Sequence, residues 1–310
     1  MTLEEGVYAA AVTPRRPSGR ELDLGASLEL VDYLGATGVR GIVLLGATGE
    51  FPHLELEERM RLASLATRRS RVPVIVNITH STLAGSIALA EEAAGAGVAA
   101  LMLMPPYFYR YDQPEVIQFY TEFADSLRAR IPVLLYNIPV FTNPIEPGTA
   151  IELLASGRFA GIKDSSGSLE YFAQLKDVCG RQNLPFIVGH DGVFARARSE
   201  GAHGVISGVS CVVPELLLAL ETAASSGDHA RRDRLDVRLQ EFLDRIDRFP
   251  GSTAIREALA VRGITVGPQA NPLGAEAARQ LAEFREWFQA WLPVVQDEVR
   301  HEEGKLRSTA

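Results

Sequence analysis

Lysine is scarce in this 310-residue chain, in which only Lys163, Lys176 and Lys305 stand against 28 arginines. A bias toward arginine explains the scarcity, so each remaining lysine raises the question of what arginine could not do there. Lys176 and Lys305 lie in polar sequence, whereas Lys163 ends the apolar run of residues 159–163. A desolvated lysine can lose its proton and act as a nucleophile, which the always protonated guanidinium cannot do. The structural alternative is a lysine that extends from a strand end into water.

Cysteine is also rare, since Cys179 and Cys211 are the only two. They are too few for a disulfide framework, so we expect free thiols in a reducing compartment and a cytoplasmic protein. The first residues lack the basic and apolar regions of a signal peptide. No apolar run in the sequence approaches the length of a membrane span.

An excess of positive charge is the third feature that is missing. The formal net charge is −8, the pI is about 5.4, and arginines alternate with acids, as in residues 57–59 and 244–248. This pattern argues against nucleic acid or an anionic membrane as a partner. The hydrophobic content of 46% is ample for a large core.

Short β-rich segments alternate with amphipathic helical segments over the first 226 residues. The β-rich segments are residues 7–12, 41–45, 72–76, 98–103, 131–136, 159–163, 186–189 and 204–207. Repeated βα units predict a parallel sheet, and eight of them match a TIM barrel in number and length. A doubly wound open sheet would carry a glycine-rich turn after its first strand, and residues 13–17 do not form one. We therefore predict a (β/α)8 barrel in residues 1–226.

Strand signals stop after the barrel, and residues 227–310 read as a helical region. Three helices are expected, over residues 228–249, 252–262 and 274–299. The polar tail of about ten residues that follows is a candidate for disorder. The helical region could cover one face of the barrel or serve assembly, and the sequence leaves both possibilities open.

Two reactive side chains fall at neighbouring strand ends. Active sites of such barrels lie at the carboxyl ends of the strands. The alternation of side chains along a strand places Tyr136 and Lys163 in the same mouth if both face the barrel interior. A phenol beside an amine can relay the protons that imine formation must move. Tyr136 alone could equally be a core residue with its hydroxyl at the rim, but the coincidence favours catalysis.

Other polar positions at strand ends suggest binding more than metal chemistry. Residues 46–50 place Thr48 between two glycines, in a turn that could direct N–H groups at a carboxylate or simply connect a strand to a helix. Glu50 with His53, and His190 with Asp191, are too sparse for a metal site, so we expect none. No GxSxG, HExxH, P-loop or CxxC pattern occurs.

A series of short motifs, in order and at family-like spacing, covers almost the whole chain. These motifs are residues 10–14, 46–50, 106–107, 136–139, 161–164, 189–191 and 204–207. With them the chain resembles the dihydrodipicolinate synthase and N-acetylneuraminate lyase family of pyruvate-dependent class I aldolases. The resemblance implies a TIM barrel with a C-terminal helical region, assembled as a homotetramer.

The resemblance also implies roles for individual residues. Lys163 matches the lysine that forms the Schiff base, and Tyr136 matches the tyrosine that moves protons. No cofactor is then needed beyond the imine on Lys163. The substrate-binding positions of the family fall on Ala47, Thr48, Tyr107, Asp191 and Ile206. Ala47 and Thr48 would hold the carboxylate of pyruvate, and Asp191 could bind a hydroxyl of the acceptor as in the neuraminate lyases.

The departures from the family bear on the substrate. Ala47 and Phe108 replace two members of the synthase's proton relay, and Phe141 replaces the arginine that grips a second carboxylate. Gly192 replaces a glutamate of the neuraminate lyases. Residues 49–52 look like branches that act on 4-hydroxy-2-oxoglutarate or deoxy sugar acids. We therefore expect a pyruvate-dependent aldolase for a 4-hydroxy-2-oxo acid or a 2-keto-3-deoxy sugar acid.

Two alternatives remain for the function. The first is 4-hydroxy-tetrahydrodipicolinate synthase, which joins pyruvate to aspartate semialdehyde. The second is a non-catalytic family member that only binds a 2-oxo acid. Lys163 and Tyr136 argue against the second, because a binding module needs no imine chemistry.

Overall fold

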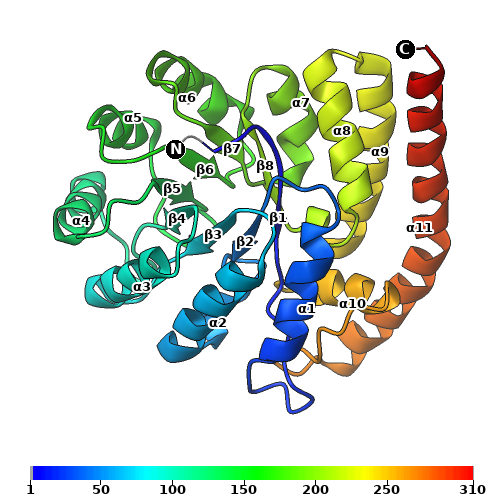
Figure 1. Ribbon diagram of the computed structural model, residues 1–310, viewed down its shortest axis with the longest axis horizontal. Coiled ribbons are helices and arrows are strands. Elements are labelled where there is room, and N and C mark those ends of the chain that lie inside the picture. Colours follow the sequence, from blue (N-terminus) through cyan, green and yellow to red (C-terminus); the bar gives the residue numbers. More distant parts are fainter. Residues whose placement is uncertain (1–2, 310) are drawn as a thin grey trace.

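Eight parallel strands close into one barrel in the computed structural model, which describes residues 3–309 and the side chains up to Arg300 (Figure 1). Neighbours in the chain are neighbours in the sheet, and β1 also pairs with β8. The strands are β1 Gly6–Ala10, β2 Gly41–Leu44, β3 Val74–Asn77, β4 Ala100–Leu103, β5 Val133–Asn137, β6 Ile162–Asp164, β7 Phe186–Val188 and β8 Gly204–Ser207. The predicted (β/α)8 barrel is confirmed.

Helices surround the barrel and short 3₁₀ turns follow three of its strands. The helices are α1 Leu24–Gly35, α2 Leu56–Arg69, α3 Leu83–Gly95, α4 Gln113–Ser126, α5 Pro147–Ala155, α6 Leu169–Gln182, α7 Phe194–Ser199 and α8 Pro214–Ser226. The 3₁₀ turns are η1 Phe51–His53, η2 Asp191–Val193 and η3 Val209–Cys211. Local caps start several helices: Asp23 accepts from the N–H of Ala26, and Ser168 accepts from that of Tyr171.

Four strands begin later than their apolar runs predicted. β3, β4 and β5 each start two residues late, and β6 starts at Ile162 instead of Phe159. The Phe159 ring packs on Tyr120 of α4, with centroids 5.4 Å apart. Apolar residues that lead into the sheet thus fill the space between barrel and helices, so hydrophobicity alone did not locate the first ladder residue.

The barrel closes along a seam between β1 and β8. A Cβ atom on Gly204 would lie 2.1 Å from the carbonyl oxygen of Gly6, far inside van der Waals contact. Only glycine allows the two strands to approach this closely. Across the same seam the Ser210 hydroxyl donates to the carbonyl of Tyr8. Strand β1 and the segment around β8, which lie far apart in the sequence, are therefore held together.

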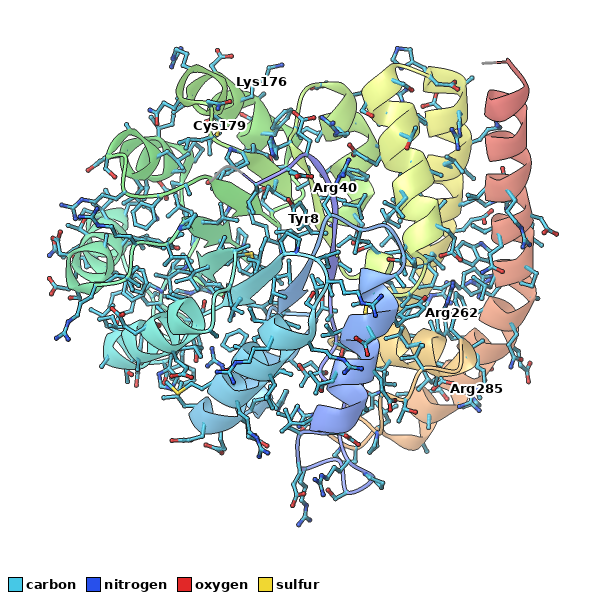
Figure 2. The ribbon with its side chains drawn as sticks, in the orientation of Figure 1. Tyr8, Arg40, Lys176, Cys179, Arg262 and Arg285 are labelled. Atoms are coloured by element: carbon cyan, nitrogen blue, oxygen red, sulfur yellow. The ribbon has the colours of Figure 1, made fainter. Side chains whose placement is uncertain are left out.

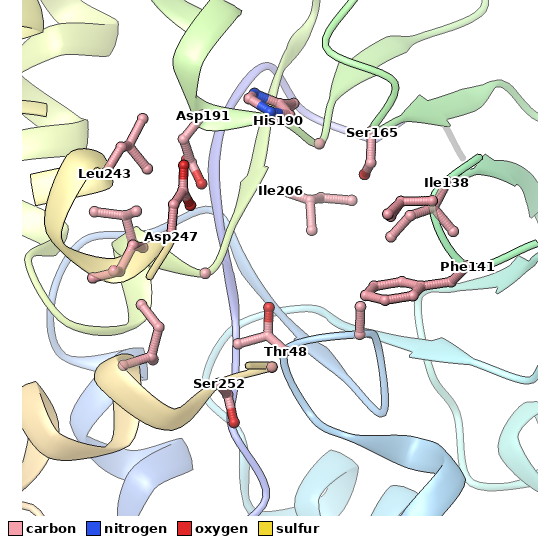
Figure 3. Close-up of a pocket in the computed structure, with 18 of the residues that line it drawn as sticks. Thr48, Ile138, Phe141, Ser165, His190, Asp191, Ile206, Leu243, Asp247 and Ser252 are labelled. Carbon is pink, nitrogen blue, oxygen red and sulfur yellow. The ribbon is translucent and has the colours of Figure 1, made fainter. Parts of the chain in front are cut away.

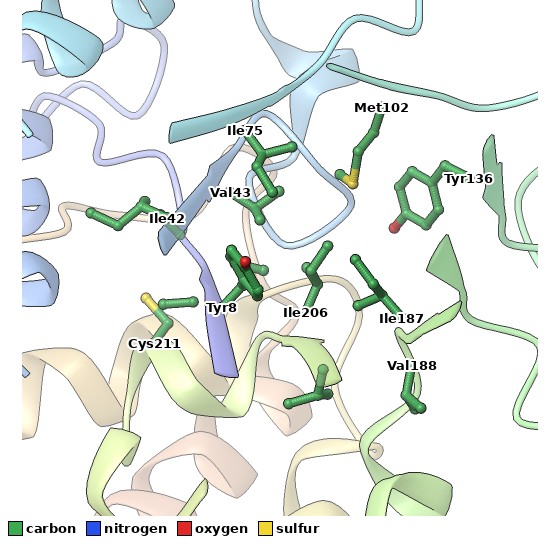
Figure 4. Packing of buried hydrophobic residues seen from close by; sticks show 14 of the residues in the cluster. Tyr8, Ile42, Val43, Ile75, Met102, Tyr136, Ile187, Val188, Ile206 and Cys211 are labelled. Carbon is green, nitrogen blue, oxygen red and sulfur yellow. The ribbon is translucent and has the colours of Figure 1, made fainter. Parts of the chain in front are cut away.

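Side chains fill the barrel interior below the mouth (Figure 4). Residues in register point to the same side of a parallel sheet, and the inward set includes Tyr8, Val43, Ile75, Met102, Tyr136, Lys163, Ile187 and Ile206. Every one of them is buried. Tyr136 and Lys163 are thus the polar top of an apolar column, as the alternation of side chains predicted.

The C-terminal helical region packs on one side of the barrel and reaches its mouth (Figure 1). It comprises α9 His229–Ile246, α10 Thr253–Val261 and α11 Ala275–Thr309. Arg262, which caps the end of α10, pairs with Glu215 of α8 at 2.8 Å, and Arg285 of α11 pairs with Glu257 of α10 (Figure 2). The region therefore covers one side of the site, as in the first of the two roles considered from the sequence.

The polar tail is helical where the sequence suggested disorder. α11 continues through Thr309, and of the tail only Ala310 lies outside the described residues. Glu302, Glu303 and Lys305 are favourable helix formers, so the helix can extend past Val299, the last buried residue among the described side chains. None of the helices in residues 3–309 combines the length and the apolar character that crossing a membrane requires.

Candidate active site

A cavity of about 310 Å³ opens at the carboxyl ends of the strands. It gathers most of the residues predicted from the sequence: Ala47, Thr48, Tyr136, Lys163, Asp191 and Ile206. Tyr107 instead lines an adjoining cavity of about 360 Å³, and Ala47 and Phe141 line both. The structure thus brings six of the predicted residues together and places the seventh, Tyr107, in the adjoining cavity.

Lys163 and Tyr136 are direct neighbours at the bottom of the cavity. They are register partners on β6 and β5, and the Lys163 Nζ lies 4.0 Å from the centroid of the Tyr136 ring. Lys163 is 4% exposed and Tyr136 1%. An amine held out of water over an aromatic ring is placed to act as a nucleophile, with a phenol at hand to exchange protons.

A buried hydrogen-bond network holds the ends of the two strands together. The Asn137 amide donates to Asp164 at 2.7 Å and accepts from the N–H of Ile145 at 3.0 Å. The Ser166 hydroxyl donates to the other oxygen of Asp164 at 2.7 Å. Burial raises the pKa of Asp164, and these hydrogen bonds oppose the rise. Because Asn137 and Asp164 directly follow the two reactive residues, the network fixes the distance between them.

Gly189, at the end of β7, leaves room for the Lys163 side chain. A Cβ atom there would lie 2.7 Å from Lys163 Cε and 2.2 Å from the Ser165 hydroxyl oxygen. The same hydroxyl is buried, has no partner among the described residues, and lines the cavity. Sequence reasoning missed Ser165, although its place two residues after Lys163, directly beyond β6, puts it on the face of Lys163 if the alternation continues past the strand.

The turn after β2 offers hydrogen-bond donors to an anion. Within residues 3–309, the N–H groups of Ala47 and Thr48 donate to no protein acceptor, and both residues line the cavity. Leu45 adopts a left-handed conformation with φ 61°, and the Asn77 amide holds its carbonyl at 2.8 Å. Non-glycine residues adopt this conformation at a cost, so the turn is held by its surroundings. Two N–H groups and the Thr48 hydroxyl can together receive a carboxylate.

Two carboxylates form one side of the cavity (Figure 3). Asp191 comes from η2, and Asp247 is the residue that caps the end of α9. Asp191 Oδ1 is buried without a partner in the described part of the chain. Burial raises the pKa of Asp191 to about 6, the negative charge of Asp247 adds to the rise, and Ser207, His190 and Lys163 oppose it. Asp247 was missed because no local pattern connects the end of a surface helix to a barrel strand.

The opposite side of the cavity is apolar. Ile138, Val140 and Phe141 line it, on the loop after β5 (Figure 3). No arginine lines the cavity among the described residues. Glu50, one of the residues considered for a metal, faces Arg256 at 3.7 Å. The part of the chain that the structure describes holds no group of three His, Cys, Asp or Glu side chains that could bind a metal ion.

Comparison with known proteins places this site in a family. The sequence model of the dihydrodipicolinate synthetase family matches residues 4–290. The chain belongs to this family. Its members are pyruvate-dependent lyases, so the protein is a carbon–carbon lyase of the aldolase type.

Individual relatives agree with that assignment. The 4-hydroxy-tetrahydrodipicolinate synthase of Methanothrix thermoacetophila is 28% identical over 91% of this chain and 95% of its own. YagE from E. coli K12, solved in complex with pyruvate, superimposes with a TM-score of 0.85 at 26% identity, over 94% of this chain and 99% of its own. The structure of KD(P)GA from T. tenax superimposes with a TM-score of 0.81 at 26% identity, over 95% of this chain and 99% of its own. Relatives in the dihydrodipicolinate synthetase family thus have different names. The substrate of this protein must therefore be inferred from its own site.

Proposed function

We propose that this protein is a cofactor-independent class I aldolase that cleaves a 4-hydroxy-2-oxo acid or a 2-keto-3-deoxy sugar acid into pyruvate and an aldehyde. The observation that carries the proposal is the buried contact between Lys163 Nζ and the Tyr136 ring, at the bottom of a cavity with a carboxylate-sized turn. The same site would run the reaction backwards, with pyruvate and an aldehyde as substrates.

The chemistry begins with attack of the neutral Lys163 amine on the C2 carbonyl. Loss of water gives a protonated imine, and Tyr136 exchanges the protons that this step requires. As Tyr136 takes the proton of the C4 hydroxyl, the C3–C4 bond breaks and its electron pair moves to the iminium nitrogen. The aldehyde leaves, the resulting enamine takes a proton at C3, and water releases pyruvate from Lys163.

The turn at Ala47 and Thr48 would hold the C1 carboxylate during these steps. The free N–H groups and the Thr48 hydroxyl are complementary to a carboxylate. Ile206 would form the floor under C3, and the free Ser165 hydroxyl and Asp191 would contact hydroxyls further along the substrate. Tyr107, in the adjoining cavity, would border the site without forming its floor.

A second candidate function, 4-hydroxy-tetrahydrodipicolinate synthase, is favoured by the name of the relative from Methanothrix thermoacetophila. Aspartate semialdehyde carries a second carboxylate, and such a group is ordinarily paired with arginine or lysine. Phe141 and the absence of a lining arginine in the described residues argue against a site for it. Condensation assays with pyruvate and this aldehyde distinguish the two functions.

A homotetramer is part of the proposal. Large apolar side chains are exposed on the loops after β4 and β5: Phe108, Tyr109, Tyr111, Val140 and Phe141. Asn143 ties the two loops together through the carbonyls of Pro106 and Tyr109. Exposed apolar surface of this kind is typical of a contact between protein chains, which supports assembly of several copies.

Reductive trapping tests the proposed function. Incubation with pyruvate and borohydride should attach one reduced pyruvate to the peptide that contains Lys163, as measured by mass spectrometry. Lys163→Arg should abolish the adduct and retro-aldol activity, whereas Lys176→Arg, a change on the outer surface of α6, should leave both unchanged (Figure 2). Absence of the adduct, or its persistence in Lys163→Arg, would exclude the mechanism.

A further inference from the structure

The ionisable groups that line the cavity are unevenly placed. In the described residues they are Lys163 and Tyr136 at the bottom of the cavity, and His190, Asp191 and Asp247 in its wall. The single lysine would be consumed by the imine. Besides His190, two carboxylates remain, and they are close enough for the charge of Asp247 to act on Asp191 (Figure 3).

The two arginines nearest Asp247 in the sequence form no ion pair with it. Neighbouring Arg248 donates to the carbonyl of Asp244 at 3.1 Å, and the Arg245 guanidinium lies over the Trp287 ring at 5.2 Å from its centroid. Both cations are therefore engaged elsewhere, and Asp247 takes part in no ion pair within the described side chains. Its charge faces the mouth of the cavity.

The buried Asp191 oxygen makes the same side selective in a second way. Because Asp191 Oδ1 has no partner among the described residues, it requires a donor from the ligand or from water. A hydroxyl can donate to it, whereas an ionised carboxylate or phosphate has no proton to donate. Placing such an anion beside Asp191 and Asp247 would also bring like charges together in a partly desolvated space.

We infer that Asp247 is a specificity-determining residue: together with Asp191 it restricts the site to 2-oxo acids whose far end is uncharged, and it rejects those with a second anionic group. This inference rests on the proposed function, because it requires the C2 carbonyl to be bound at Lys163. Asp247 is exposed at the mouth, so solvent and salt screen its charge. Its own contribution to discrimination should be about threefold to tenfold.

Imine trapping with a matched pair of 2-oxo acids tests the inference without knowledge of the natural substrate. The pair is 2-oxopentanoate and 2-oxoglutarate, which have the same chain length and differ in a methyl or carboxylate end. The measured quantity is the concentration of each acid that gives half-maximal borohydride adduct on Lys163. In the unmodified protein 2-oxoglutarate should require at least about ten times more than 2-oxopentanoate.

The selectivity ratio is the half-maximal concentration of 2-oxoglutarate divided by that of 2-oxopentanoate, and variants at Asp247 should change it. Asp247→Asn should narrow it about threefold to tenfold, and Asp247→Arg should narrow it further or reverse it. Sodium chloride at about 0.5 M should narrow the ratio in the unmodified protein but not in Asp247→Asn. Asp244→Asn, on an exposed position three residues earlier in α9, is the control and should leave the ratio unchanged.

The outcomes separate this inference from the proposed function. A normal pyruvate adduct with a ratio that neither Asp247 variant alters would overturn the inference and leave the aldolase proposal intact. A loss of adduct with pyruvate itself in the unmodified protein would remove both. A ratio that changes in Asp244→Asn as much as in Asp247→Asn would show a general effect of surface charge and would also overturn it.

Discussion

The two sides of the cavity differ in how they are held. On the barrel side, Tyr136 and Lys163 are register partners, and the Asn137–Asp164 hydrogen bond at 2.7 Å fixes the strand ends that carry them. On the helical side, Asp247 caps a helix and stands exposed at the mouth. The buried, hydrogen-bonded side is suited to bond breaking, which tolerates little displacement, and the exposed side is suited to selecting the ligands that enter.

The largest expected effect breaks the barrel side at Tyr136. Tyr136→Phe keeps the ring that contacts Lys163 Nζ and removes only the hydroxyl. Because the hydroxyl would carry protons in each step, kcat for pyruvate release should fall by about 10²–10⁴. Tyr8→Phe is the matched control: this buried tyrosine donates to the carbonyl of Glu4, which precedes β1 and lies away from the cavity. Its kcat should stay within a factor of two, and an equal loss in both variants would refute a proton-transfer role.

An intermediate effect is expected from moving Lys163 without altering it. Gly189→Ala would place a methyl group 2.7 Å from Lys163 Cε, so the amine must shift. We expect kcat/KM and the rate of adduct formation to fall by about tenfold to a hundredfold. Gly180→Ala, in α6 with no atom near its added Cβ, should keep full activity. Unchanged trapping in Gly189→Ala would mean that the position of the amine is not critical.

The smallest effect concerns the free energy of unfolding and Asp191, the barrel residue beside Asp247. The pKa of Asp191 is raised in the fold to about 6, so the folded protein binds its proton more tightly than the unfolded chain. The stability that this proton gives is present at low pH and is lost as pH rises from about 4 to 6. Asp191→Asn should therefore gain stability over the unmodified protein across that window, by about 1–2 kcal/mol at pH 7 after allowance for partial exposure.

Urea unfolding at pH 4 and at pH 7 measures this difference. Asp244→Asn again serves as a control, because its side chain is exposed and outside the cavity. Equal stability differences at the two pH values would show that Asp191 is not destabilised by ionisation in the fold.

The same contrast explains what could be predicted from the sequence. The barrel, its eight strands and the meeting of Tyr136 with Lys163 follow from alternation and repeat spacing, because these features are local or repeated. The first residues of β3 to β6 were misplaced, since apolar residues such as Phe159 serve the barrel–helix interface as well as the ladder. The same alternation could have revealed Ser165.

The residues that depend on tertiary packing, such as Asp247, could not be predicted from alternation or repeat spacing. Asp247 belongs to a run of alternating acids and arginines that is typical of a solvated helix, and its place beside Asp191 depends on how α9 packs against the barrel. The position of Tyr107 in the adjoining cavity depends likewise on loop geometry. Tertiary packing, which leaves no local signature, decided both.

The seam between β1 and β8 has a consequence for how the enzyme becomes active after synthesis. Gly6 and Gly204 can meet only after more than 200 residues have left the ribosome, and α9 follows later still. Contacts of such long sequence separation form late and slowly in folding. A nascent chain that already contains Lys163 therefore lacks a closed barrel around it, so the reactive amine gains its buried setting only when the protein is nearly complete.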